Sequence, residues 1–310
     1  MIYRPFGKRL GWNVSAIGMG TWNIGSQWGE VDDITSFATI RAAFEAGMNL
    51  YDTAEAYGTT HGLSEERLGV ALAGMRHRVY LVSKIGHYGR RSGQAVPKNT
   101  VDMIRLCAHA ILHRLRTDWV DVMLCHEHDI ADPSIYLETF ELLKKQGRIR
   151  AHGISTDNID VLKRYNAAGL ADVVEVNYSL LNRAAEEQVL PYCREHGLGV
   201  LIRGPLAMGM LSGRYSAQTV FTDSIREKWN RDENAKARFL AQAASVEKLK
   251  KALAPGQDMV TAALRFTISH PAAPVSIPGA KDPAQVRMNA AAGDRTLTAA
   301  EIKKYLAAMD

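Results

Sequence analysis

The fold of this chain is indicated most directly by one short stretch, Asn49-Leu50-Tyr51-Asp52-Thr53-Ala54-Glu55-Ala56-Tyr57-Gly58. A short apolar run ends at Asp52 and Gly58 interrupts the pattern, which predicts a buried strand followed by a loop. That loop would carry both a carboxylate, Asp52, and a phenol, Tyr57. A tyrosine with its ordinary pKa of about 10 keeps its proton at neutral pH. To donate it in catalysis, Tyr57 needs a neighbouring cation that lowers its pKa, and Asp52 could keep such a cation charged.

The same order of short apolar run, loop and amphipathic helix recurs along the chain. Strands are predicted at residues 16–20, 49–52, 79–84, 119–126, 150–155, 172–177, 198–203 and 273–278. Helical spacing is clear in the stripe formed by Val101, Ile104, Ala108, Ile111 and Leu115. Thr298 and Glu301 predict a capping box for the last helix.

Alternation of strands and helices predicts parallel strands joined by helical crossovers. About eight such units in 310 residues favour an α/β fold of the (β/α)8 TIM-barrel class, in one domain over residues 1–310 with a short N-terminal β-hairpin. A doubly wound sheet is the alternative. It is disfavoured because no glycine-rich phosphate-binding fingerprint follows the first predicted strand.

Composition narrows the classes of function. The chain is 46% hydrophobic and 23% charged, with a formal net charge of +5 and no basic block that would indicate nucleic-acid binding. No apolar run is long enough to predict a membrane span, and the N-terminus lacks the apolar core of a signal peptide. Cys107, Cys125 and Cys193 fit no metal or redox spacing, so we expect a cytoplasmic protein without a metal site.

Polar side chains stand at the ends of consecutive predicted strands. Asp52 with Tyr57, then Lys84, His126 and Ser155 occupy these positions. Each has an ordinary explanation alone, such as a helix cap, a rim aromatic or a surface residue. In a barrel, however, the carboxyl ends of the strands meet on one face, where active sites form. An acid, a phenol, an ammonium and an imidazole on that face predict a proton-transfer site.

The motifs of this chain resemble those of the aldo-keto reductases over nearly its whole length. The matching segments are residues 18–22 (GMGTW), 52–58 (DTAEAYG), 64–69 (SEERLG), 83–84 (SK), 119–121 (WVD) leading to His126, 147–150 (GRIR) with 153–155 (GIS), 178–183 (YSLLNR), 204–215 (GPLAMGMLSGRY) and 277–280 (IPGA). The resemblance implies a (β/α)8 barrel that binds a nicotinamide dinucleotide, usually NADPH, and reduces aldehydes and ketones to alcohols. The family's catalytic tetrad falls on Asp52, Tyr57, Lys84 and His126.

The resemblance also implies roles for these residues. Tyr57 would donate a proton to the carbonyl oxygen while His126 orients it. Lys84, paired with Asp52, would lower the pKa of Tyr57 and stabilise the tyrosinate. Trp22, Tyr57 and His126 would contact the substrate, and Trp28, His87, Tyr88 and His128 lie on loops expected to open on the same face.

A long set of residues matches the family's cofactor site. We expect the dinucleotide to contact Gly20, Thr21, Trp22, Asp52, Ser155, Thr156, Glu175, Arg203, Gly204, Pro205, Leu206, Met208, Arg214, Gly279, Ala280, Lys281, Gln285 and Asn289. Thr156 and Glu175 depart from the family's Asn and Gln. Lys281, with Arg287 as a weaker candidate, is the basic residue available to bind the extra phosphate of NADPH, so NADPH is favoured and NADH remains an alternative.

Arg203 stands where the family usually has an aromatic residue on the nicotinamide. Its guanidinium could stack on the ring, but a buried charge needs a partner. We expect Glu175, one strand earlier, to pair with Arg203.

The function predicted from the sequence is NADPH-dependent carbonyl reduction with Tyr57 as proton donor, of the alcohol dehydrogenase type, acting on a small-molecule substrate. One alternative is a regulatory, redox-sensing subunit with little turnover. Another is an unrelated barrel lyase or isomerase, which would use residues 204–213 as a phosphate-binding loop. We expect residues 222–234 to form a polar, mobile loop. The oligomeric state is left open.

Overall fold

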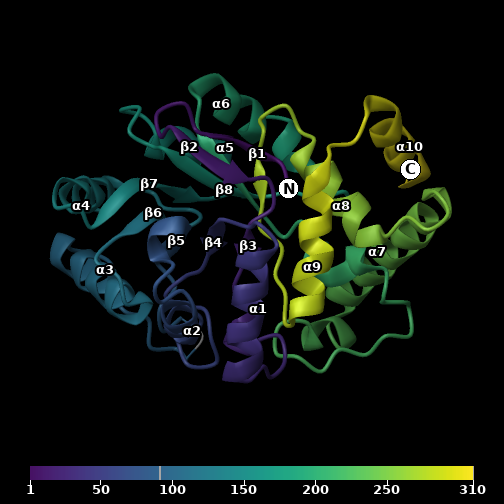
Figure 1. The fold of residues 1–310 in the computed structure, drawn as a ribbon, viewed down its shortest axis with the longest axis horizontal. Coiled ribbons are helices and arrows are strands. Elements are labelled where there is room, and N and C mark those ends of the chain that lie inside the picture. Colours follow the sequence, from purple (N-terminus) through teal and green to yellow (C-terminus); the bar gives the residue numbers. More distant parts are fainter. Residues whose placement is uncertain (91, 310) are drawn as a thin grey trace.

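Eight short parallel strands form one sheet in the computed structural model, which describes residues 1–90 and 92–309 (Figure 1). Their order in the sheet follows the chain: β3 (Met19–Gly20), β4 (Leu50–Asp52), β5 (Tyr80–Ile85), β6 (Val120–Cys125), β7 (Ile149–Ser155), β8 (Val173–Asn177), β9 (Gly199–Arg203) and β10 (Val275–Ser276). Backbone hydrogen bonds from Gly18 to Ser276 (2.8 Å) and from Gly20 to Pro278 (3.0 Å) join the first strand to the last. The predicted (β/α)8 barrel is therefore confirmed.

Every strand expected from the sequence overlaps an observed one. β3 and β10 are shorter than predicted, because residues beside them pair only through isolated bridges, Ile17 with Ser276 and Gly20 with Gly279. The predicted N-terminal hairpin is also present, as β1 (Tyr3–Phe6) antiparallel to β2 (Trp12–Ser15). Phe6 and Val14 pack in one apolar cluster with inward-facing strand residues such as Leu50, Val122 and Leu201.

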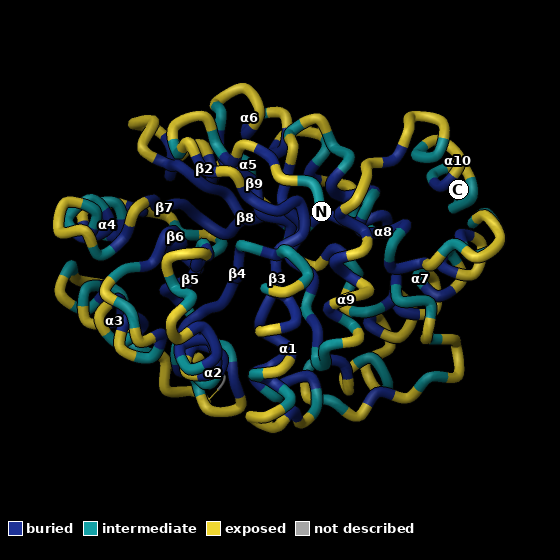
Figure 2. Tube along the Cα trace, viewed as in Figure 1, coloured by how far each residue is buried: buried dark blue, intermediate teal, exposed yellow. Residues whose placement is uncertain are grey.

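Helices surround the strands (Figure 1), and the exposed residues of the chain lie mainly on the helices and loops, while the strands are buried (Figure 2). They are α1 (Asp33–Glu45), α2 (Leu63–Ala71), α3 (Val101–Leu115), α4 (Ser134–Lys145), α5 (Ile159–Tyr165), α6 (Val189–His196), α7 (Glu233–Ala252), α8 (Met259–Ile268), α9 (Pro283–Ala291) and α10 (Ala299–Met309). α3 illustrates the local causes: the Thr100 side chain accepts a hydrogen bond from the Met103 amide at its start, and Ile104, Ala108 and Ile111 form its buried face.

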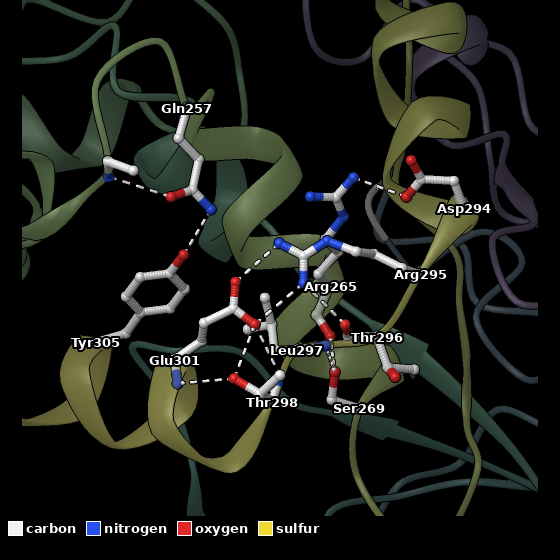
Figure 3. Close-up of polar contacts among 11 residues, drawn as sticks. Gln257, Arg265, Ser269, Asp294, Arg295, Thr296, Leu297, Thr298, Glu301 and Tyr305 are labelled. Carbon is white, nitrogen blue, oxygen red and sulfur yellow. Dashed lines mark hydrogen bonds and ion pairs between the residues drawn. The ribbon is translucent and has the colours of Figure 1, made fainter.

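The last helix has the capping box predicted from the sequence (Figure 3). The Thr298 amide donates to Glu301 Oε2 (2.8 Å) and the Glu301 amide donates to Thr298 Oγ1 (3.2 Å). Arg295 adds an ion pair to the same carboxylate at 2.8 Å, and Gln257 donates to the Tyr305 hydroxyl at 2.5 Å. These contacts fix the start of α10 and tie the helix to the segment after α7.

Close contact between β7 and β8 leads to a stability prediction. A Cβ atom on Gly153 would lie 1.7 Å from the Val173 carbonyl oxygen, which belongs to the neighbouring backbone and cannot rotate away. We expect Gly153→Ala to lower the free energy of unfolding by about 1–3 kcal/mol, the usual range for an overpacked core. Chemical denaturation of the two proteins measures this change. An unaltered denaturation midpoint would contradict the close contact.

Candidate active site

Lys84 lies at the centre of the candidate site. It comes from β5 and its side chain is 0% exposed. Its Nζ donates to both oxygens of Asp52 at 2.6 and 2.7 Å, to the Thr53 carbonyl at 3.0 Å and to the Tyr57 hydroxyl at 3.2 Å. Although burial acts to lower the pKa of Lys84, the charges of Asp52, Glu175 and Tyr57 outweigh it and raise that pKa above its ordinary value. The ammonium is therefore a permanent charge next to the phenol.

Tyr57 is held on the loop after β4 by close backbone contacts. Gly58 has φ of 140°, a conformation that side chains disfavour, and a Cβ there would lie 2.2 Å from the Thr60 carbonyl oxygen. The Tyr57 ring stacks on Trp22 with 5.6 Å between ring centroids. Burial raises the pKa of Tyr57 and outweighs the lowering effect of Lys84. Lys84 thus acts on this pKa in the expected direction, but burial has the larger effect, so the pKa of Tyr57 lies above its ordinary value.

His126 follows β6 and reaches the same site. Its amide donates to the Ile85 carbonyl at 2.8 Å, which places the ring edge-on to Tyr57, with 6.3 Å between centroids. Burial, with the nearby His87 and Lys84, holds the pKa of His126 well below its ordinary value. The imidazole is therefore neutral at pH 7. His87 stacks on it at 4.1 Å, and His128 lies edge-on at 5.6 Å.

These side chains form one end of a cavity of about 1050 Å³. Its wall includes Trp22, Tyr57 and His126 together with Gly279, Lys281 and Asn289. Most of the residues expected to bind the cofactor line it: Gly20, Thr21, Trp22, Asp52, Glu175, Arg203, Gly204, Pro205, Leu206, Met208, Arg214, Gly279, Lys281, Gln285 and Asn289. The structure thus places the predicted catalytic side chains Asp52, Tyr57 and His126 and most of the predicted cofactor residues around one cavity.

Three expected cofactor residues do not line the cavity. The Ser155 hydroxyl donates to Glu175 Oε1 at 3.2 Å, and the Thr156 hydroxyl donates to the His128 carbonyl at 2.7 Å. Ala280 is buried, with 1% of its surface exposed. Ser155 and Thr156 therefore support residues of the cavity wall.

The expected pairing of Glu175 with Arg203 is wrong. Arg203 donates to Asp157 Oδ2 at 2.5 Å, whereas Glu175 Oε2 lies 3.2 Å from Lys84 Nζ. Strand register gives the reason: Arg203 is level with Asn177 in β8, and Glu175 is two residues earlier on that strand. The guanidinium therefore stands nearer the rim of the barrel, and Glu175 faces the Lys84 ammonium.

The loops contribute residues that the sequence did not indicate. Residues 222–234 include a short 3-10 helix, Glu227–Asn230, and Arg226 is only 8% exposed. Arg226 pairs with Asp223 at 2.8 Å and donates to the Tyr215 hydroxyl at 2.7 Å. Arg226, Lys228 and Arg238 all line the cavity. No sequence motif indicated them: Arg226 and Lys228 come from the segment before α7, and Arg238 comes from α7 itself.

The loop aromatics divide between the cavity and its surroundings. Trp28, His87 and His128 line the cavity, as expected from their loops. Tyr88 instead packs against His61, with 4.9 Å between ring centroids. Across residues 1–90 and 92–309 we find no group of metal-ligating side chains suited to holding an ion. The same residues contain no helix of the length and apolarity that crossing a membrane requires.

Comparison with known proteins gives a consistent result. The family model described as "Aldo/keto reductase family" matches residues 16–309. The aldo-keto reductase YhdN of Bacillus subtilis is 33% identical over 286 residues, which cover 89% of this chain and 84% of that protein. The NADH-specific methylglyoxal reductase of Escherichia coli is 31% identical, with 93% of this chain and 92% of that protein covered.

Solved structures agree with the sequence comparisons. The holo form of aldo-keto reductase AKR11C1 from Bacillus halodurans has a TM-score of 0.81 at 27% identity, covering 99% of this chain and 96% of that chain. An aldo/keto reductase from Klebsiella pneumoniae in complex with NADP and acetate has a TM-score of 0.71 at 29% identity, covering 97% and 92% respectively.

Proposed function

Because the chain belongs to the aldo/keto reductase family, we propose that this oxidoreductase uses NADPH to reduce an aldehyde or ketone to an alcohol, with Tyr57 as the proton donor. The observation that carries the proposal is the contact of Tyr57, on the cavity wall, with a buried ammonium. Lys84 Nζ lies 3.2 Å from the Tyr57 hydroxyl and is held in place by Asp52.

The cavity fits a dinucleotide in size and in chemistry. It is lined by the buried carboxylates Asp52 and Glu175 and by the basic residues Lys281 and Arg238. Glu175 Oε2 is ion-paired with Lys84 Nζ at 3.2 Å but accepts no hydrogen bond from the described residues, so it would accept one from a carboxamide. Gly279 lets Asn23 pack directly against the cavity wall, since a Cβ there would lie 1.8 Å from Asn23 Oδ1. We assign cofactor binding to those predicted residues that line the cavity, with Ser155 and Thr156 acting through Glu175 and His128.

When bound, the reduced nicotinamide supplies a hydride to the carbonyl carbon. The residues of this chain then manage the charge that develops on the carbonyl oxygen. Tyr57 donates its proton to that oxygen, and the neutral His126 imidazole donates a hydrogen bond to it. Lys84 stays charged throughout and stabilises the tyrosinate that remains. Trp22 and His126 form the wall against which the substrate rests.

A short substrate rich in oxygen suits the wall around Tyr57. His87, His126 and His128 present three imidazoles there, and Trp22 adds one flat apolar face. Imidazole nitrogens both donate and accept hydrogen bonds, so they suit a carbonyl with a second oxygen beside it. The methylglyoxal reductase relative, whose name contains such a substrate, supports this choice. We therefore propose a 2-oxo or 2-hydroxy aldehyde as the substrate class.

Cofactor oxidation with a panel of carbonyl compounds tests this function. Purified protein with NADPH or NADH should oxidise the cofactor faster with methylglyoxal or glyceraldehyde than with an unsubstituted aldehyde of equal length. Binding of NADPH without oxidation by any carbonyl compound would instead favour the regulatory alternative. Failure to bind either dinucleotide would contradict both. The cytoplasmic location stays a prediction.

Cofactor preference depends on Lys281 in this proposal. Its Nζ contacts the Trp28 carbonyl oxygen at the cavity wall, and Arg226 and Lys228 line the same cavity. We expect Lys281→Ala to raise the KM for NADPH by roughly tenfold or more, the range for a lost charged hydrogen bond, and the KM for NADH much less. Initial rates at varied NADPH and NADH concentrations measure the two KM values. Arg287→Ala is the matched control, since Arg287 is exposed and is not among the residues that line the cavity. Equal effects on both cofactors would contradict the role of Lys281.

A further inference from the structure

Two carboxylates share the single ammonium at the base of the cavity. Lys84 Nζ lies 2.6 Å from Asp52 and 3.2 Å from Glu175. The three side chains are 0%, 3% and 1% exposed, in the order Lys84, Asp52 and Glu175. With all three ionised, this buried group carries one net negative charge. With the family's neutral Gln in place of Glu175, the same buried group would have no net charge.

No second cation balances this charge within residues 1–90 and 92–309. Lys84 is the one basic side chain there that forms an ion pair with Asp52 or Glu175. The Arg203 guanidinium is paired with Asp157, and the His126 imidazole is neutral. Ser155 donates a hydrogen bond to Glu175 Oε1, but it brings no charge.

An uncompensated charge in a buried site is costly, and binding a proton removes it. Burial first, and the charge of Glu175 second, raise the pKa of Asp52 well above its ordinary value, against the opposing effect of Lys84. A positive charge placed beside the pair has the opposite effect, because it stabilises both carboxylates. Asp52 and Glu175 line the cavity, so a ligand in the cavity can exert this effect.

We propose that Asp52 and Glu175 form a proton-binding pair that responds to the redox state of the cofactor. The inference rests on the proposed function. Beside a reduced, neutral nicotinamide the pair holds one proton, which burial and the charge of Glu175 favour at Asp52. Beside an oxidised, cationic nicotinamide the same pair is fully ionised and the proton is released. The charged or titratable groups that act on the pair are Lys84 from β5 and Tyr57 from the loop after β4. His126 after β6 and Arg203 from β9 act on each other, and Arg203 is paired with Asp157.

Isothermal titration calorimetry can count this proton without any turnover. NADPH and NADP⁺ are titrated separately into the protein near pH 7, in buffers of different ionisation enthalpy. The dependence of the binding heat on the buffer gives the number of protons bound or released. We expect NADPH binding to take up close to one proton more than NADP⁺ binding. Protons linked to the extra phosphate cancel in this difference, because both forms of the cofactor carry that phosphate.

Two variants assign the proton to the pair. Glu175→Gln keeps the shape of the side chain and should reduce the difference in proton uptake to near zero. Glu55→Gln is the matched control, because Glu55 is equally buried but pairs with Lys98 at 3.4 Å and should keep the difference. If NADPH and NADP⁺ bound to the unaltered protein with the same number of protons, the inference would be overturned and the proposed function would still stand. A difference that persists in Glu175→Gln would also overturn it. Absence of binding would overturn the proposed function together with it.

Discussion

Replacement of Tyr57 by phenylalanine is expected to lower kcat for carbonyl reduction by roughly 10²–10⁴-fold, the usual contribution of a positioned proton donor. The variant keeps the aromatic ring that stacks on Trp22, with 5.6 Å between centroids, so the cavity wall keeps its shape. It loses only the hydroxyl that Lys84 contacts at 3.2 Å. Steady-state kinetics should therefore show a much lower rate, while the dissociation constant for NADPH should stay nearly unchanged.

Tyr88→Phe is the matched control for this experiment. Tyr88 lies on a loop at the same end of the barrel, but its ring packs against His61. We expect this variant to retain nearly full activity. Burial raises the pKa of Tyr57, so the phenol of the unaltered protein should remain able to donate a proton through neutral and moderately alkaline pH. A near-normal rate in Tyr57→Phe would exclude Tyr57 as the donor.

Strand periodicity explains why the proximity of Asp52, Tyr57, Lys84 and His126 could be predicted from sequence. Asp52 pairs with Val82 across β4 and β5, and Lys84 lies two residues beyond Val82. Since alternate residues of a strand share a face, Lys84 projects to the same side of the sheet as Val82. Parallel strands bring their carboxyl ends to one edge, so His126 arrives there from β6. These relations depend only on recognising the strands.

Contacts between side chains at different levels of the barrel could not be predicted in this way. The partner of Glu175 depends on the register between β8 and β9. That register places Arg203 beside Asn177, two residues beyond Glu175. The pKa of Tyr57 is set by two opposing effects, burial, which raises it, and the Lys84 charge, which lowers it. The sequence does not give the extent of burial, so the larger effect could not be predicted. Arg226 reaches the cavity from a loop without periodicity, where no sequence pattern specifies direction.

Lys84→Met is expected to give the largest loss of stability among the substitutions considered. Methionine fills a similar volume, but it leaves Asp52 and Glu175 without the ammonium that both contact. Removing one partner of a buried ion pair typically lowers the free energy of unfolding by about 3–5 kcal/mol. Catalysis should be lost as well, because no cation remains to stabilise the Tyr57 tyrosinate.

The pH dependence of this loss follows from the pKa of Asp52. Burial and Glu175 already raise that pKa while Lys84 opposes them, so removing Lys84 raises it further. A carboxyl group whose pKa is higher in the folded than in the unfolded protein stabilises the fold at low pH, and this contribution is lost as pH rises through the folded-state pKa. Relative to the unaltered protein, Lys84→Met should therefore be least destabilised in acid and most destabilised at neutral pH.

Chemical denaturation at several pH values measures this dependence, and Lys98→Met provides the comparison. Lys98 is also a largely buried lysine, with 6% exposure, paired with Glu55 at 3.4 Å. Its loss leaves Glu55 with hydrogen bonds from the amides of Gly86 (2.8 Å) and Tyr88 (3.3 Å), so the destabilisation should be smaller. It should also spare catalysis, because Lys98 does not contact Tyr57. If Lys84→Met were no less stable at neutral pH than Lys98→Met, the two carboxylates would not depend on Lys84 for their charge.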